Sequence, residues 1–232
     1  MTVTETTASV VSAARAALTT VRDPELDEPI TALGFVASCT VSREGRATVR
    51  LRLPTYFCAP NFAFLMVADA YDAVMTAEGV TSAEVILEDH FASDQINAGV
   101  AAQEGFVRSF QGEASAELDE LRKTFLRKAV MAGTDIVCRP LLAAGMSPEK
   151  LAILTLGQTP PSEQLNRLRR RRADLGLPAD DNAFLLIDPA TGDCLAPAEI
   201  PLHLRKARVT RAGIEANTSI CSGMLQSRYP AD

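Results

Sequence analysis

The amino-acid sequence predicts an α+β protein, and three observations support this. Two runs of alternating apolar side chains, residues 35–42 and 48–53, flank a polar stretch that contains Gly45. A helical pattern of apolar residues follows at 62–74, and a third alternating run lies at 83–88. Alternation is typical of half-buried strands, and spacings of three and four residues are typical of helices. We therefore expect a small α-β-β-α-β domain, with its helices on one face of a three-stranded sheet.

The other elements of this domain follow from local signals. A first helix is predicted at residues 8–20, where apolar side chains recur on one face. This helix ends at residues 22–29, RDPELDEP, which contain two prolines and four acidic residues. We call this segment the acidic break. The first two strands are expected to pair as a hairpin around the SREGR turn, and Gly79 ends the second helix.

The remainder of the chain predicts mainly helices. We expect them at 94–110, 115–131, 161–174 and 200–212, with a shorter one from Ser147. Ser115 is expected to cap the helix at 115–131, in which acidic residues lead and basic residues trail. A short hairpin is expected near residues 184–196. The predicted division is therefore residues 1–92, the small domain, and residues 93–232, a mainly helical region.

Composition excludes several classes of protein. The formal net charge of -6 argues against non-specific nucleic-acid binding, which needs a basic surface. No apolar run is long enough for a transmembrane helix, and the first residues lack the features of a signal peptide, so a cytoplasmic protein is expected. The five cysteines are widely spaced and odd in number, which favours free thiols over a disulfide framework.

Cys58 is the first candidate for chemistry, because it falls between a predicted strand and the start of a predicted helix, in LPTYFCAPNF. Unpaired N–H groups at a helix start favour a thiolate, the form that binds metals and attacks electrophiles. The alternative is a small buried side chain in a turn. Further candidate metal ligands are Asp23 and Glu25 in the acidic break and His90 after the third strand. Their alternative is a solvated loop or strand end.

A run of four basic residues is the candidate partner-binding site in this acidic chain. It comprises Arg169, Arg170, Arg171 and Arg172 at the end of a predicted helix. Such a run would dock an acidic partner. The alternative is a solvated helix end whose charge is favourable to the helix dipole.

Two stretches of the sequence resemble the iron–sulfur cluster assembly domain of SufT-like and PaaD-like proteins. RDPELDEPITALGFV is similar to that family's "DPE…LG(L/F)V" opening, and RLPTYFCAPNF is similar to its strand–Cys–Pro–helix motif. The likeness covers about residues 8–90. Ala59 separates Cys58 from Pro60, whereas in many members the cysteine directly precedes the proline.

The resemblance implies a cytoplasmic factor for metalloprotein maturation, with Cys58 and Asp23 at its functional surface and Glu25 nearby. One thiolate per chain would hold iron or an iron–sulfur cluster weakly, or across a homodimer, which suits transfer. The expected protein is therefore a non-catalytic factor with a transient iron or cluster cargo and a client apo-metalloprotein. Family association points to a multicomponent di-iron monooxygenase as that client.

Two other functions remain open from the sequence. The same fold would serve as a metal-free interaction scaffold or assembly chaperone if Cys58 were a core residue. A thiol enzyme would use Cys58 as its nucleophile, and it would need His90 or His203, the only histidines, as its base.

Overall fold

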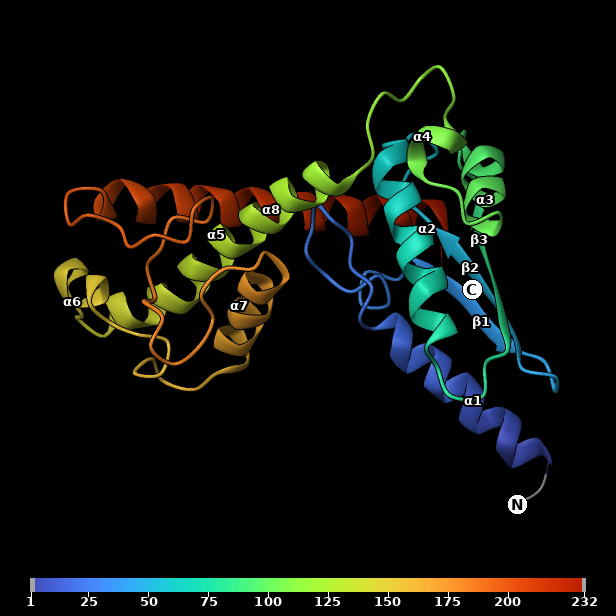
Figure 1. Cartoon of the computed structure of the whole chain (residues 1–232), viewed down its shortest axis with the longest axis horizontal. Coiled ribbons are helices and arrows are strands. Elements are labelled where there is room, and N and C mark those ends of the chain that lie inside the picture. The colour runs from blue at the N-terminus through green and yellow to red at the C-terminus, as the bar shows by residue number, and fades with distance from the viewer. Residues whose placement is uncertain (1–2, 231–232) are drawn as a thin grey trace. The chain divides into compact units, whose positions relative to one another are not determined.

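The computed structural model describes the backbone of residues 3–230 and the side chains of residues 8–230. The chain forms two compact units (Figure 1). The first comprises Met1–Asp119 and Thr218–Asp232, and the second comprises Glu120–Asn217. The first unit is therefore discontinuous in sequence. This division differs from the expected boundary near residue 92, because α3 packs on the sheet and the last turns of α8 return to the first unit.

The first unit confirms the predicted α-β-β-α-β order. Its elements are α1 (Val3–Leu18), β1 (Val36–Val41), β2 (Arg46–Arg52), α2 (Pro60–Met75), β3 (Ser82–Glu88), α3 (Ser93–Ala101) and α4 (Phe106–Ser109). The sheet order is β1-β2-β3, with β1 and β2 antiparallel and β2 and β3 parallel. Val49 in the central strand pairs with Cys39 and with Val85. The sheet is thus mixed, and the predicted hairpin forms its antiparallel half.

Alternation along the strands buries one face of this sheet. Cys39, Val49 and Val85 point into the core, whereas Thr40 between buried neighbours is exposed. Strict alternation through the run at 35–42 would place Ala37 on the same inner face as Phe35 and Cys39. It is exposed instead, because the pairing with β2 is irregular between Val36 and Ser38. A single extra residue reverses the side-chain direction in this way.

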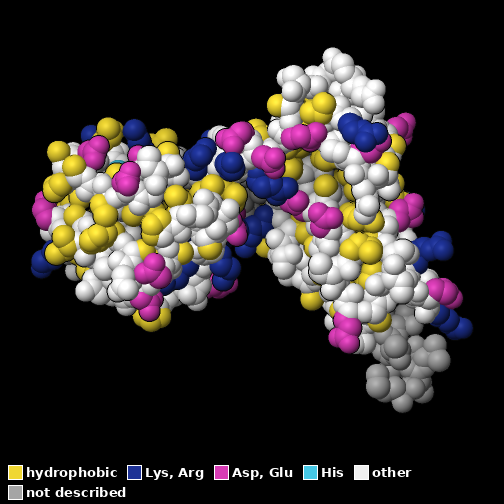
Figure 2. Space-filling view, in the orientation of Figure 1, with side chains coloured by type: hydrophobic (Ala, Val, Ile, Leu, Met, Phe, Trp, Pro, Cys, Tyr) yellow, Lys and Arg dark blue, Asp and Glu magenta, His cyan; other side chains and the backbone are white. Residues whose placement is uncertain are grey.

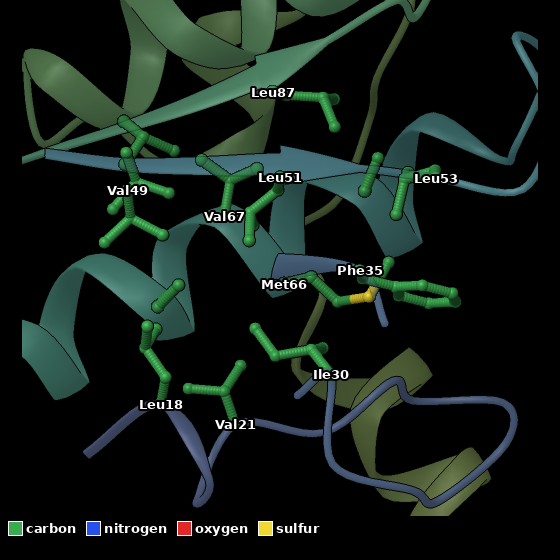
Figure 3. Packing of buried hydrophobic residues seen from close by; sticks show 14 of the residues in the cluster. Leu18, Val21, Ile30, Phe35, Val49, Leu51, Leu53, Met66, Val67 and Leu87 are labelled. Carbon is green, nitrogen blue, oxygen red and sulfur yellow. The ribbon is translucent and has the colours of Figure 1, made fainter. Parts of the chain in front are cut away.

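The core of the first unit lies between the sheet and its helices. In Figure 3, Val49, Leu51 and Leu87 from the strands converge on Met66 and Val67 of α2. Leu18, Val21, Ile30 and Phe35, from α1 and the segment that follows it, also belong to the cluster, and so does Leu53 just after β2 (Figure 3). Burial of these apolar side chains is the main force that holds the acidic break and the sheet together.

The second unit is built from helices. Its elements are most of α5 (Asp119–Ala143), α6 (Pro148–Ala152), α7 (Glu163–Asp174) and the first part of α8 (Ile200–Arg228). Ser147 and Ser162 cap α6 and α7 by accepting backbone N–H bonds, and a helix start at Ser147 was expected. Acidic and basic side chains are interspersed on the visible face of each unit (Figure 2).

Several boundaries differ from the expected ones. The helix expected at 94–110 is two helices, α3 and α4, because the chain turns at Gln103, whose φ is +54°. The helix predicted from residue 115 begins at Asp119. The Glu117 side chain, two residues before that start, instead accepts bonds from the backbone N–H groups of Phe106 and Val107 in α4.

The C-terminal region also departs in detail from the prediction. The expected hairpin near 184–196 is a turn with one bridge between Ile187 and Cys194, because few backbone bonds join its arms. The helix expected at 200–212 continues to Arg228. Its extension has no strong apolar periodicity, so the sequence pattern did not reveal it.

Candidate functional site

Cys58 lies in the loop that joins β2 to α2, two residues before the helix begins at Pro60. Its side chain is half-buried, and its Sγ lies 3.3 Å from the Thr55 hydroxyl oxygen. That hydroxyl accepts a bond of 3.2 Å from the Phe57 backbone N–H. The hydroxyl proton can therefore be donated to the sulfur. The sequence prediction of a thiol beside a helix start agrees with this position.

The His90 side chain contacts the backbone of this loop. Its Nε2 lies 2.7 Å from the Cys58 carbonyl oxygen, and its Nδ1 accepts a 3.2 Å bond from the Ala92 N–H. Acceptance at Nδ1 makes Nε2 the donor to the carbonyl, which is the neutral tautomer. Burial lowers the pKa of His90, in agreement with a neutral ring. Both ring nitrogens are thus engaged with the backbone, so His90 positions the Cys58 loop in this structure, and its role as a metal ligand stays a prediction.

Asp23 organises the acidic break. Its Oδ1 accepts bonds of 2.8 Å from the backbone N–H groups of both Glu25 and Leu26. The side chain is buried, and this burial raises the pKa of Asp23 despite the two backbone bonds, with a further contribution from the charge of Glu25. Glu25 is itself half-buried. The break is therefore an ordered turn and not a solvated loop.

The predicted metal ligands do not form a ready-made ion site. Among the residues whose side chains are described, no three His, Cys, Asp or Glu side chains are grouped so that they could hold a metal ion. The structure brings His90 to the backbone of Cys58 and Asp23 to the backbone of its own turn.

The end of α8 docks on the loops around Cys58. Leu225 is buried in the core of the first unit. It packs close to Gly34, since a Cβ atom added to that glycine would lie 3.3 Å from Leu225 Cδ2. Arg228 donates a 3.1 Å bond to the Leu53 carbonyl, at the start of the Cys58 loop, and a second bond to the Asp89 carbonyl. The Tyr229 hydroxyl lies 2.9 Å from an Asp89 carboxylate oxygen. These contacts join the C-terminal turns to the ends of β2 and β3.

Cys221 is a functional candidate that sequence reasoning missed. It lies one turn before Leu225 on α8, is half-buried and contacts the same apolar cluster as Cys58. Burial raises the pKa of Cys221, and so do the negative charges of Asp23, Cys58 and Glu25. The helix therefore brings a second thiol to the core of the unit that contains the predicted ligands. No signal in the sequence connects positions so far apart.

Three exposed aromatic side chains lie on the Cys58 loop or next to it. Tyr56 and Phe57 belong to the loop, and Phe91 follows His90. Their ring centroids are separated by 5.0 Å, 6.1 Å and 6.3 Å, so the three rings form one surface. Phe57 is 76% exposed, which is unusual for a large apolar side chain in a folded protein. We call these three residues the aromatic surface.

A pocket adjoins the aromatic surface at the start of α2. Its volume is about 390 Å³, and Phe91 is shared between the two features. Phe106 and Phe110 form an apolar wall, and Glu113 contributes one carboxylate. The loop that contains Cys58 therefore adjoins apolar surface that is suited to contact with another molecule.

Comparison with known proteins assigns the N-terminal part of the chain. Residues 12–85 match the family described as iron-sulfur cluster assembly protein. This part of the chain is an iron-sulfur cluster assembly domain. Searches of curated proteins and of solved structures found no match to the chain. The match includes Asp23, Glu25 and Cys58 of the candidate site, whereas His90 and Cys221 lie outside it.

The assembly domain does not account for the arginine run in the second unit, which proves to be largely structural. Arg171 and Arg172, two of the predicted partner-binding residues, are buried, which leaves little of either side chain at the surface for a partner to contact. Arg172 donates to the carbonyl oxygens of Phe184 and Leu185, and Arg169 bonds to the Ala179 carbonyl and pairs with Asp181 at 2.7 Å. Arg170 is the exposed member of the run. The guanidinium groups hold the loop that follows α7.

The remaining cysteines differ in burial from those near the assembly domain's loop. Cys39 and Cys138 are buried, and Cys194 is exposed. Burial raises the pKa of Cys138 to about 12.

Within residues 3–230, every helix is too short or too polar to cross a lipid bilayer.

Proposed function

We propose that this protein is a non-catalytic maturation factor that holds iron or an iron–sulfur cluster transiently and passes it to a client apo-metalloprotein. The observation that carries the proposal is the half-buried Cys58 thiol, in the loop just before α2 and inside the iron-sulfur cluster assembly domain. Thiolates are the usual protein ligands of iron–sulfur clusters. The iron or cluster is cargo in this role.

A weak site suits the proposed transfer. Stable clusters are commonly held by four thiolates, whereas the matched domain offers Cys58 with the carboxylates of Asp23 and Glu25 close to its core. Asp23 has backbone bonds that keep its turn ordered. The missing ligands would come from sulfide, from a second chain in a homodimer or from the client. Their departure would release the cargo.

The aromatic surface supports the proposal of a protein client. Tyr56 and Phe57 of the Cys58 loop and the neighbouring Phe91 present exposed aromatic rings, and aromatic residues are enriched at protein interfaces. We propose that a client, in the cytoplasm, covers these rings while it receives iron. A multicomponent di-iron monooxygenase is the proposed client, and that choice rests on the family resemblance alone.

Anaerobic reconstitution tests the cargo. The full chain is treated with ferrous iron and sulfide, desalted, and analysed for bound iron and for visible absorption. We expect iron and colour in the wild type, at least a tenfold loss in Cys58→Ala, and no loss in Cys194→Ala, which removes an exposed thiol of the second unit. A wild type that stays colourless and free of iron overturns the proposal that this protein carries iron.

Client binding is tested separately. Calorimetry with an apo di-iron hydroxylase should show binding that Phe57→Ser weakens at least tenfold, because the change removes the most exposed ring. Val209→Ser is the matched control, since Val209 is an exposed apolar residue of the second unit. Equal weakening by both changes, or none by either, contradicts docking through the aromatic surface.

A metal-free assembly scaffold is the second candidate. It is favoured by His90, whose two ring nitrogens are both occupied by the backbone, and by the aromatic surface. Client maturation in a Cys58→Ala strain separates the two functions. Maturation at the wild-type level would support the scaffold, and loss of maturation would support iron transfer.

A further inference from the structure

The pocket at the start of α2 combines aromatic rings with one negative charge. Three of its lining residues are phenylalanines, namely Phe91, Phe106 and Phe110. Among the described residues that line it, Glu113 carries the one ionisable side chain. The volume of about 390 Å³ lies in the range of pockets that bind small ligands. This composition favours a ligand that has both a flat or apolar surface and a positive charge.

Tertiary contacts hold the aromatic wall of this pocket in place. The ring of Phe106 packs against Phe64 and Phe110, with centroid separations of 5.5 Å and 4.7 Å, and both of these neighbours are buried. The Glu117 carboxylate accepts bonds from the backbone N–H groups of Phe106 and Val107. The wall therefore exists before a ligand binds, which lowers the entropic cost of binding.

A turn after α4 places Glu113 beside these rings. Its backbone N–H donates a 3.1 Å bond to the Phe110 carbonyl, and Gly112 before it has a φ of +81°, which glycine adopts without strain. Glu113 is exposed, so a ligand can reach its carboxylate from solvent. Arg108, the basic residue of α4, pairs with Glu104 at 3.2 Å and is not part of the lining.

The start of α2 also lines the pocket, and a helix start favours anions when its N–H groups are available. Here Pro60 has no N–H, and the N–H groups of Phe62 and Ala63 donate to the Ala59 carbonyl. The helix start therefore offers few donors to an anion, and the Glu113 carboxylate determines which charge the pocket prefers.

We propose that this pocket receives an arginine side chain of the client, whose guanidinium group lies against the phenylalanine rings and donates to the Glu113 carboxylate. The inference rests on the proposed docking of a client and deepens it, because Phe91 belongs both to the aromatic surface and to the pocket. Guanidinium groups stack on aromatic rings and pair with carboxylates in a fixed geometry. An uncharged side chain would displace water from Glu113 without replacing its hydrogen bonds.

A fragment titration of the full chain tests the pocket without iron and without a client. The probe is n-butylguanidinium, its neutral isostere n-butylurea is the comparison, and ¹H–¹⁵N NMR is the readout. The cation should shift the amides of Asn61, Phe91 and Phe110, and the urea should bind about fivefold more weakly. Glu113→Gln should remove most of that difference, and Phe106→Leu should weaken the cation about threefold. Glu84→Gln, at an exposed strand position, is the matched control and should equal the wild type.

Equal binding of the cation and the urea overturns the inference, and so does a cation that shifts none of these amides. Added salt should weaken the cation and leave the urea unchanged, because only the cation is held by charge.

Calorimetry with the apo di-iron hydroxylase tests the occupant. Glu113→Gln should weaken client binding about fivefold, and Glu84→Gln should leave it unchanged. If Phe57→Ser weakens the client while Glu113→Gln does not, docking at the aromatic surface stands and the arginine inference is wrong. If the chain fails to take up iron but Glu113→Gln still weakens the client, the carrier function is wrong and the arginine inference stands.

Discussion

Cysteine and arginine serve different purposes in the two units. Cys138 of the second unit is fully buried, and its pKa is raised to about 12, so its thiol is an apolar packing group at neutral pH. Cys58 of the first unit is half-buried in a loop, beside a hydroxyl group and exposed aromatic rings. The difference shows that residue type alone does not identify a reactive site.

The arginines make the same point in the other direction. Arg172 of the second unit is buried among backbone carbonyls, and burial lowers its pKa to about 10. Arg228 of the first unit also donates to carbonyl oxygens, but it does so at the surface, where it holds α8 to the Cys58 loop. Arg172 stabilises the core of the second unit, and Arg228 holds the end of α8 to the loop that contains Cys58.

The largest expected effect concerns the two thiols. At pH 8 a thiol with a pKa of about 12 is ionised in only about one molecule in 10⁴, and burial further blocks reagents. Iodoacetamide should therefore modify Cys58 at least about a thousandfold faster than Cys138. Peptide mass spectrometry measures both rates in the native chain. Similar rates in the native state, with the unfolded chain as control, would break the comparison.

Replacement of the buried arginine should have the next largest effect. Arg172→Ala leaves the carbonyl groups of Phe184 and Leu185 without their donor and opens a cavity. We expect the free energy of unfolding to fall by about 3–5 kcal/mol, measured by urea denaturation. Arg170→Ala, at the exposed neighbour, should change it by no more than about 0.5 kcal/mol. Equal effects at both positions would contradict the structural role of Arg172.

Loss of the surface arginine should act locally. Arg228→Ala removes the donor to Leu53 and Asp89, so the last turns of α8 should open more often. A cost of about 1 kcal/mol would raise the alkylation rate of the half-buried Cys221 about fivefold. Tyr229→Phe removes one bond to Asp89 and should give a smaller increase. An unchanged rate in Arg228→Ala would mean that this contact does not hold the helix.

The smallest expected effect is the pH dependence that Asp23 confers. Burial raises the pKa of Asp23 in the folded chain above its unfolded value. The folded state therefore binds the proton more tightly, so this contribution to stability is present below the unfolded pKa and is lost as pH rises through the folded pKa. Asp23→Asn keeps a side-chain oxygen for Glu25 and Leu26 but carries no charge.

Denaturation across acidic to neutral pH tests this sign. The stability of Asp23→Asn relative to the wild type should increase as pH rises. Glu84→Gln, at an exposed strand position, should show no such trend. The opposite slope in Asp23→Asn would show that the two backbone bonds outweigh burial.

Local patterns predicted most of the first unit. Alternation located the strands, and the helix signals at Ser147 were correct because a cap acts within one turn. The start of α5 was wrong because the Glu117 side chain is used by α4, which is a tertiary contact. Ala37 was misplaced by an irregular strand pairing that leaves no mark in the residue pattern.

The candidate site was predictable only in part. Cys58 and Asp23 fall in local motifs, and the family comparison covers both. The role of His90 depends on a backbone carbonyl thirty-two positions away in the chain, and the place of Cys221 in the first unit depends on the late segment from Thr218 onwards. Non-local contacts of this kind need coordinates. The burial of Arg171 and Arg172 was not predicted, because a charge pattern does not reveal which guanidinium groups are buried.

The return of α8 also bears on how the protein is made. A ribosome synthesises residues 218–230 after the whole of the second unit, yet Leu225 belongs to the core of the first. N-terminal domains generally begin to fold while synthesis continues. Until the last turns of α8 are translated, the apolar surface of the first unit that Leu225 covers therefore stays exposed. The core of this unit is complete only after that. During that interval, chaperones that bind apolar surface would have a site on the nascent first unit.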